Sequence, residues 1–126
     1  RNLSVGDSVN LERSLTYDSL IGGHFLQGHV DAVETVVQKS AFDDKESRIR
    51  ITANNIDQDT IVLKGSVAIE GVSLTIANVG KEWFEVAIIP TTEELTTLAQ
   101  LAEGDQVNIE TDIFARTIAH VIRRMK

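Results

Sequence analysis

Two short segments near the two ends of the chain are almost identical, and this internal repeat constrains the fold more than any other feature. Gly6-Asp7 is followed by Ser-Val-Asn-Leu-Glu, and Gly104-Asp105, 98 residues later, is followed by Gln-Val-Asn-Ile-Glu. In each segment a Gly-Asp turn precedes residues that alternate as in a strand. This period predicts one complete domain of about 98 residues, preceded by the closing strand of a similar, mostly absent domain. The alternative is a coincidence between two eight-residue windows.

The sequence between the two repeats consists of short alternating stretches separated by turn residues. It predicts about six strands, which is typical of a small antiparallel barrel or sandwich. A short helix is expected near Asn55 or Asp57, and another, started by a capping box of Thr91 and Glu94, after Pro90. The expected strands cover residues 3–11, 27–38, 47–53, 67–76, 83–89 and 106–112, with a bend or bulge at Glu70-Gly71.

The last residues have a helical pattern. Apolar residues recur at helical spacing from Ile113 to Met125, with three arginines on the other side, which predicts an amphipathic helix. His120 on this helix is expected to be solvated. We therefore divide the chain into residues 1–13, the closing strand of a preceding homologous barrel, residues 14–112, a complete barrel, and residues 113–126, the terminal helix.

The composition argues against several classes of partner. The net charge of −7 argues against nucleic acid, because phosphate contacts need a basic face. No apolar run approaches the ~20 residues of a membrane span. The sequence contains no cysteine, which fits a reducing compartment. We therefore expect a cytoplasmic protein that binds neither nucleic acid nor a membrane. Because the first residue is arginine, a fragment or a processed chain is expected.

Three glycines and two histidines lie within the ten residues from Gly22 to Asp31. Glycines at this density indicate backbone that bends or that a ligand approaches closely. His24 and His29 are five residues apart, and on an extended strand an odd separation places side chains on opposite faces. We therefore expect no metal site at these histidines.

A second stretch, from Lys64 to Ile76, carries hydroxyl groups on a predicted strand. Ser73 and Thr75 share one face, roughly 7 Å apart from the rise per strand residue. Such a pair suits a flat polar heterocycle, and the alternative is an ordinary solvent-facing surface. Lys64-Gly65 has the alternative of a plain surface turn. The residues by themselves predict a small β-barrel with a candidate ligand cleft.

Taken together, these motifs resemble the riboflavin synthase alpha chain family, at the C-terminal one of its two homologous barrels. The combination of G-G-H-x-x-x-G-H-[VI] with K-G-x-x-x-[IV]-x-G-x-S-L-T is specific, although either motif alone is weak. The resemblance covers about residues 3–126 and departs from the family pattern at Glu70 and Thr91. The segments that carry it are Gly22–Asp31, Lys64-Gly65, Glu70–Thr75, Ile88–Thr92, Thr96–Leu98 and Val107–Glu110.

The resemblance implies an all-β fold, a six-stranded antiparallel Greek-key barrel with short helices and a C-terminal helix that forms a homotrimer. It implies the dismutation of two molecules of 6,7-dimethyl-8-ribityllumazine into riboflavin and 5-amino-6-(D-ribitylamino)uracil. No metal and no redox cofactor would be needed. Lumazine synthase is a further partner that the resemblance suggests.

The resemblance also assigns residues. His29 would shuttle or orient a proton, and Lys64 would reach a neighbouring subunit's ligand. Asp112 would contact the ribityl chain or support a residue that does. Ser73, the third residue assigned to catalysis, would bond the ring or the ribityl chain together with Thr75, and the backbone of residues 87–89 would pair with the ring edge. The implied substrate-binding residues are Gly28, His29, Val30, Lys64, Ser73, Leu74, Thr75, Ala87, Ile88, Ile89, Pro90, Thr91 and Thr92.

Three functions are compatible with these motifs. The first is the C-terminal, substrate-binding half of riboflavin synthase. Its active site would join two barrels from different subunits, so this half alone is expected to be inactive. The second is a non-catalytic lumazine- or flavin-binding module that resembles the lumazine proteins of light-emitting bacteria. The third is a barrel that serves only to form a trimer.

Overall fold

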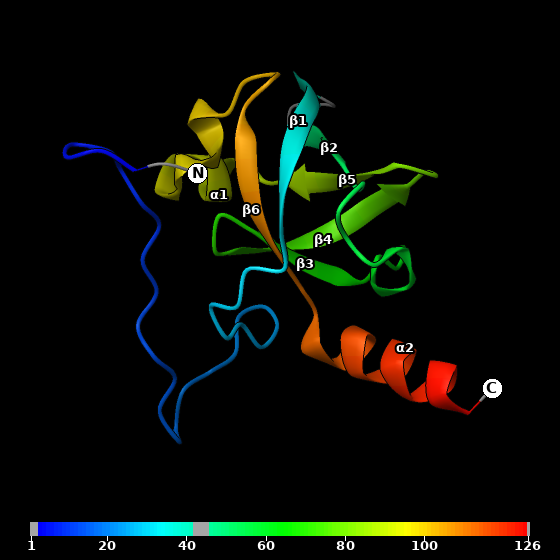
Figure 1. The fold of residues 1–126 in the computed structure, drawn as a ribbon. Coiled ribbons are helices and arrows are strands. Elements are labelled where there is room, and N and C mark those ends of the chain that lie inside the picture. Colours follow the sequence, from blue (N-terminus) through cyan, green and yellow to red (C-terminus); the bar gives the residue numbers. More distant parts are fainter. Residues whose placement is uncertain (1–2, 42–45, 126) are drawn as a thin grey trace.

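The strands of the computed structural model, which describes residues 3–41 and 46–125, form one closed antiparallel barrel (Figure 1). Neighbouring strands follow the order β1-β2-β5-β4-β3-β6, and β6 returns to pair with β1. This confirms the predicted all-β barrel of six antiparallel strands. The strands are β1 (Ala32–Ala41), β2 (Ser47–Thr52), β3 (Ser66–Ile69), β4 (Val72–Val79), β5 (Trp83–Ile88) and β6 (Gln106–Thr111).

Alternate side chains of each strand fill the inside of the barrel. In β5, for example, Phe84, Val86 and Ile88 are fully buried and alternate with half-buried residues. This period of two follows from the pleat of a strand, which sends successive side chains to opposite faces. The core that results is almost entirely aliphatic. Its fully buried large side chains are Phe84, Ile49, Ile51, Ile69, Ile76, Ile88, Leu98, Ile109, Val36, Val67, Val86 and Val107.

The bend expected at Glu70-Gly71 is instead a two-residue hairpin turn that separates β3 from β4. Ile69 lies opposite Val72 in the ladder, so only these two residues form the loop. Glu70 has φ +50° and Gly71 has φ +77°, the left-handed pair that a type I′ turn requires. The single strand expected over residues 67–76 is therefore two strands, because the apolar parity changes at a chain reversal.

No strand forms among residues 3–30, which consist of turns and extended chain along one side of the barrel (Figure 1). The strand predicted over 3–11 is thus absent, and the one predicted over 27–38 begins later, at Ala32. A strand needs a partner to complete its hydrogen bonds. The role of residues 1–13 in closing a preceding barrel stays a prediction, and residues 1–2 lie outside the described part.

Asn10 attaches this N-terminal segment to the barrel. Its Nδ2 donates to the backbone carbonyl of Glu70 at 2.8 Å and to Oγ1 of Thr97 at 2.9 Å. Its Oδ1 accepts the backbone N–H of Thr97 at 2.8 Å. One side chain therefore connects the segment to the β3–β4 turn and to the helical turns before β6.

Short helical segments connect the later strands. They are η1 (Gln58–Thr60), α1 (Pro90–Leu95) and η2 (Thr97–Gln100). The predicted capping box of Thr91 and Glu94 is wrong, because α1 begins at Pro90 with Ile89 as an N-cap that makes no side-chain bond. Proline suits the first helical position, since its missing N–H would have no partner there.

The C-terminal helix α2 (Ile113–Arg124) confirms the helix predicted after the last strand. The predicted helix extended to residue 126, which lies outside the described part. The helix leaves the barrel at β6 (Figure 1), and His120 on it is exposed, as expected. Arg123 binds the carboxylates of Asp57, the N-cap of η1, and of Asp59 within η1. The hydrogen bond from Arg123 lowers the pKa of Asp57. The hydrogen bonds to Asp57 and Asp59 raise the pKa of Arg123. Neither α2 nor any other helix of the described residues is long and apolar enough to cross a membrane.

Candidate ligand-binding site

Ser73 and Thr75 point outward from β4, as the alternation predicts. Leu74 and Ile76, between and beyond them, are buried in the core. Thr75 lies opposite Ala87 of β5, and Ser73 lies opposite Ala68 of β3. The two hydroxyl groups and the small Ala87 side chain therefore share one outer face of the barrel.

The ladder between β4 and β5 ends early on this face. Its last pair is Thr75 and Ala87, although β4 begins three residues earlier, at Val72. Ile76 exchanges backbone bonds with Lys64 and Gly65 on the β3 side, at 2.9 Å each. Because bonding directions alternate along a strand, the N–H and C=O of Ser73 point the other way, toward β5.

The missing pairs leave backbone groups without a strand partner. By the same alternation the N–H of Ile89, just beyond β5, points toward β4, while its C=O accepts the N–H groups of Thr92 and Glu93. Within the described ranges no ladder pair joins Ser73 to the β5 side. The barrel wall thus presents main-chain donors and an acceptor beside two hydroxyls.

The glycine-histidine segment, residues 22–31, crosses the outside of the barrel and contacts Ser73. Nδ1 of His24 lies 2.8 Å from Oγ of Ser73. A Cβ on Gly23 would lie 2.4 Å from the same oxygen, closer than real Cβ contacts allow. Glycine is therefore needed at position 23 so that the backbone can approach β4 and His24 can reach the serine.

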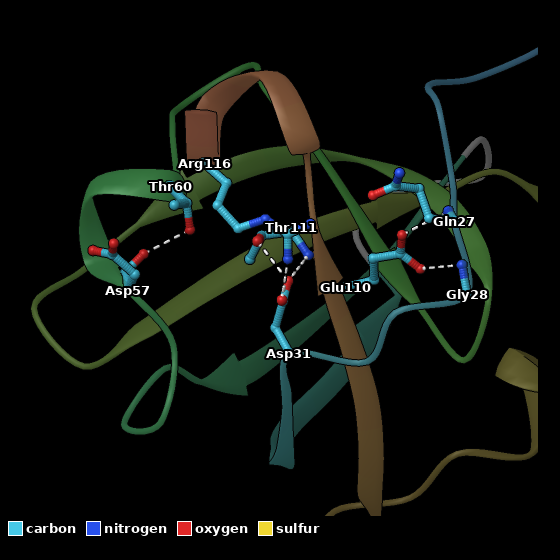
Figure 2. Close-up of polar contacts among 8 residues, drawn as sticks. All are labelled: Gln27, Gly28, Asp31, Asp57, Thr60, Glu110, Thr111 and Arg116. Atoms are coloured by element: carbon cyan, nitrogen blue, oxygen red, sulfur yellow. Dashed lines mark hydrogen bonds and ion pairs between the residues drawn. The ribbon is translucent and has the colours of Figure 1, made fainter. Parts of the chain in front are cut away.

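Glu110 holds the same segment from β6 (Figure 2). Its carboxylate accepts the N–H of Gln27 at 2.7 Å and the N–H of Gly28 at 3.0 Å. The residue is only 8% exposed, although it lies opposite the outward-pointing Ala68 of β3. A carboxylate this deeply buried needs such donors to replace its water.

Asp31 fixes the far end of the segment (Figure 2). One carboxylate oxygen accepts the N–H and the Oγ1–H of Thr111, each at 2.7 Å, and the other binds Arg116 of α2. Two carboxylates therefore bracket the three residues Gly28 to Val30. His29 is exposed and Val30 is 55% exposed, so this short loop presents both side chains outward.

An open cavity of about 880 Å³ lies between the N-terminal segment and this outer face. Two of the residues predicted to bind substrate, Gly28 and Ser73, line it, as does His24. Other parts of its wall come from Ser8–Leu15, Gly71–Ser73 and Glu94–Thr97. His29, Lys64 and Thr75 do not line this cavity, so the structure brings His24 rather than His29 to Ser73.

The remaining predicted residues have varied environments. The side chains of Leu74 and Ile88 belong to the core, so only their backbone atoms form part of the barrel wall. Lys64 is exposed on a turn with φ +66°. Oδ1 of Asp112 caps α2 by accepting the N–H of Phe114 at 2.8 Å. Ile89, Pro90 and Thr91 are exposed at the start of α1, and the half-buried Thr92 accepts a bond from Thr96.

Three residues that the sequence analysis did not select build this region, namely His24, Glu110 and Asp31. A signal existed for His24, because it directly follows two glycines and so belongs to a backbone built for close approach. Glu110 carried no signal, since a carboxylate in a strand usually faces water. Among the described residues, no three histidine, aspartate or glutamate side chains gather as a metal site would require.

Comparisons with known proteins agree with this geometry. A family model described as the lumazine binding domain matches residues 27–112. Riboflavin synthase of Mycobacterium tuberculosis (strain ATCC 25618 / H37Rv) is 42% identical over 124 residues, which are 96% of this chain and 61% of that protein. Riboflavin synthase of Chlamydia muridarum is 36% identical over 126 residues, 100% of this chain and 61% of that protein. The chain thus spans about three fifths of the length of these relatives.

Solved structures show the same fold. A crystal structure of LumP complexed with 6,7-dimethyl-8-(1'-D-ribityl) lumazine matches with a TM-score of 0.64 and 25% identity, over 77% of this chain and 51% of that chain. A second structure, of LumP complexed with riboflavin, matches with a TM-score of 0.68 and 24% identity, over 75% of this chain and 51% of that chain.

Proposed function

Because the chain belongs to the lumazine-binding domain family, we propose that it is the lumazine-binding half of a riboflavin synthase. Relatives with this name are 36–42% identical over nearly the whole chain, which supports the assignment. The substrate is then 6,7-dimethyl-8-ribityllumazine. Two such molecules exchange a four-carbon unit and give riboflavin and 5-amino-6-(D-ribitylamino)uracil.

The observation that carries the proposal is the interrupted ladder between β4 and β5. A lumazine ring has an edge of alternating carbonyl and N–H groups, which pairs with backbone as an added strand would. The N–H and C=O of Ser73, which have no ladder partner on the β5 side among the described residues, and the N–H of Ile89 offer this pairing. Ser73 and Thr75 add hydroxyls for the ring or the ribityl chain, and Ala87 leaves room for the ring plane.

The protein has two tasks in this reaction. It holds two rings against each other, which removes much of the entropic barrier, and it moves protons to and from an acidic ring methyl group. His29 is suited to the second task, since an imidazole side chain can donate and accept a proton and this one is exposed. Because the loop Gly28 to Val30 points outward, His29 would serve a ring held between this barrel and another one.

We extend the proposal to assembly and location. The exposed face of α2 is apolar and includes Phe114, Ile118, Val121, Ile122 and Met125. A face of this kind suits packing between copies, so we propose that α2 takes part in a homotrimer. Lumazine synthase is a proposed associate, and the cytoplasm is the proposed location. Lys64 and Asp112 remain proposed contacts of the ligand.

Fluorescence titration with riboflavin and with the lumazine tests binding. Ser73→Ala is expected to weaken the affinity about fivefold to tenfold, the effect of one lost hydrogen bond. Ser4→Ala, which removes a hydroxyl from an exposed N-terminal turn, is the matched control. Equal affinity of the Ser73→Ala variant and the parent chain would contradict the proposed site.

A turnover measurement tests whether this barrel supplies only half of an active site. The lumazine is mixed with the 126-residue chain, and riboflavin absorbance is followed. Because the second ring needs another barrel, the chain alone is expected to form no riboflavin, whereas a longer protein that contains this chain is expected to form it. Rapid turnover by the chain alone would show that one barrel suffices.

A second candidate is a binding module without catalysis. The similarity to LumP complexed with the lumazine favours it. The two candidates differ in one result, because a longer protein of the binding-module type would bind the lumazine and leave it unchanged.

A further inference from the structure

We propose that His24 is a positioning residue that makes the Ser73 hydroxyl a hydrogen-bond donor to the ligand. The inference rests on the proposed function for the identity of the ligand, and it concerns how one group of that site is set. It begins with the contact of 2.8 Å between Nδ1 of His24 and Oγ of Ser73. Both residues line the open cavity on the outer face.

Two features fix this contact. Gly23 lies so close to Ser73 that any side chain at position 23 would collide with the serine. Four residues after His24, Glu110 holds the N–H of Gly28, so the segment is tied to the barrel on the C-terminal side of the histidine. His24 therefore reaches Ser73 on a constrained backbone.

The second nitrogen of the ring decides the direction of the hydrogen bond. Nε2 of His24 is buried and has no hydrogen-bond partner within residues 3–41 and 46–125. In a neutral imidazole one nitrogen carries the hydrogen and the other accepts. Buried N–H groups without a partner are rarer in proteins than under-satisfied acceptors. The hydrogen therefore belongs on Nδ1, and Nε2 keeps the unused lone pair.

This tautomer determines what Ser73 offers. Nδ1–H donates to Oγ, so the hydroxyl acts as acceptor toward the histidine and its own hydrogen stays available. A serine hydroxyl has one donor and two acceptor positions. The free hydrogen then serves a ring carbonyl or a ribityl oxygen, whereas the opposite tautomer would use it up on the histidine.

The first test is nuclear magnetic resonance of the histidine rings in the 126-residue chain without ligand. Two-bond nitrogen–hydrogen correlations report which ring nitrogen carries the hydrogen, and the exposed His29 and His120 serve as internal references. We expect hydrogen on Nδ1 of His24. Hydrogen on Nε2 would overturn the inference, whatever the chain binds.

The second test uses two replacements that mimic different ring nitrogens. His24→Asn places an amide N–H near the position of Nδ1, and His24→Gln places one near Nε2. Riboflavin affinity is expected to stay within about twofold for His24→Asn and to fall about fivefold for His24→Gln, since only the first keeps a donor to Oγ. Similar losses in both variants would overturn the inference.

A double variant separates positioning from a general structural effect. If His24 acts through Ser73, His24→Gln adds no further loss to Ser73→Ala, because the group it orients is already missing. Additive losses would contradict this. If the parent chain binds neither riboflavin nor the lumazine, the proposed function fails for this chain, and the ring measurement alone decides the role of His24.

Discussion

The inside of the barrel and the glycine-histidine segment, residues 22–31, are held by different interactions. We call this segment the covering segment below, because it crosses the outer face of the barrel. The inside is a continuous cluster of aliphatic side chains around Phe84. The covering segment is attached by single polar contacts, from His24 to Ser73, from Glu110 to Gln27 and Gly28, and from Asp31 to Thr111. Each of these contacts joins residues at least 49 positions apart in the sequence.

This difference separates stability from function. Burial of apolar area is non-directional and tolerates small shifts, whereas a hydrogen bond requires defined distances and angles. The barrel can therefore remain folded while the covering segment moves by a fraction of an ångström. A ligand-binding face built from such contacts is more sensitive to substitution than the barrel that supports it.

The largest expected effect is in the core. Phe84→Ala removes a fully buried ring and is expected to lower the free energy of unfolding by about 3–5 kcal/mol. Chemical denaturation measures this loss. Phe114→Ala is the control, because Phe114 is 59% exposed on α2. Equal losses in the two variants would show that the barrel interior is not the dominant source of stability.

The next effect is at the closest contact of the covering segment. Gly23→Ala introduces a Cβ against Ser73, which is expected to displace the segment at a cost of about 1–3 kcal/mol, as overpacking does. Riboflavin affinity should fall with it. Gly22→Ala is a matched control, because nothing lies within 4 Å of the Cβ that it adds. Indistinguishable unfolding curves and affinities for the two variants would argue against close packing here.

A smaller effect is expected where the segment meets β6. Glu110→Gln leaves one good acceptor for two N–H groups, and a hydrogen bond to a charged group contributes about 1.5 kcal/mol, or tenfold. Amide hydrogen exchange at Gln27 and Gly28 should therefore become about tenfold faster, with the core amides unchanged. Glu103→Gln, on an exposed turn, controls for the change in charge. Unaltered exchange at both amides would remove Glu110 from the site.

The smallest effect concerns the end of α2 and depends on pH. The hydrogen bond from Arg123 holds the pKa of Asp57 below its ordinary value of 3.8. A carboxyl group with a lowered folded pKa stabilises the fold at higher pH, and this contribution is lost as the pH falls through the folded pKa. Arg123→Gln should therefore lower the melting temperature slightly at pH 7, and the difference should vanish in strong acid.

Arg124→Gln is the control for this prediction. Arg124 is exposed on the same turn of α2, and its substitution removes the same charge. A pH-independent difference between the Arg123→Gln variant and the parent chain would mean that the contact with Asp57 does not carry the effect.

Several elements of the fold could be predicted because their signals are local. The alternation of Ile49 and Ile51 with arginines in β2, and the helical spacing of apolar residues in α2, need no knowledge of the rest of the chain. The strand predicted over residues 3–11 does not form in this structure, for the opposite reason. Residues 3–11 alternate as a strand does, but a strand also needs a neighbour with free hydrogen-bonding groups.

The candidate site could be predicted only in part. The outward direction of Ser73 and Thr75 followed from the period of two along a strand. Which histidine meets Ser73 did not follow, because neither spacing nor composition tells how the glycine-histidine segment returns across the barrel. The end of the β4–β5 ladder was equally hidden, since it depends on where two strands diverge in space.

The sequence by itself determined a small antiparallel β domain, the terminal helix and the face of β4 that carries the hydroxyls, because the spacing of apolar residues specifies which side of each element is buried. Only the tertiary structure decided that His24 lies against Ser73, that Glu110 and Asp31 bracket His29, and that the β4–β5 ladder ends at Thr75 and Ala87. Those contacts join residues far apart along the chain, and their geometry exists only after the barrel has closed.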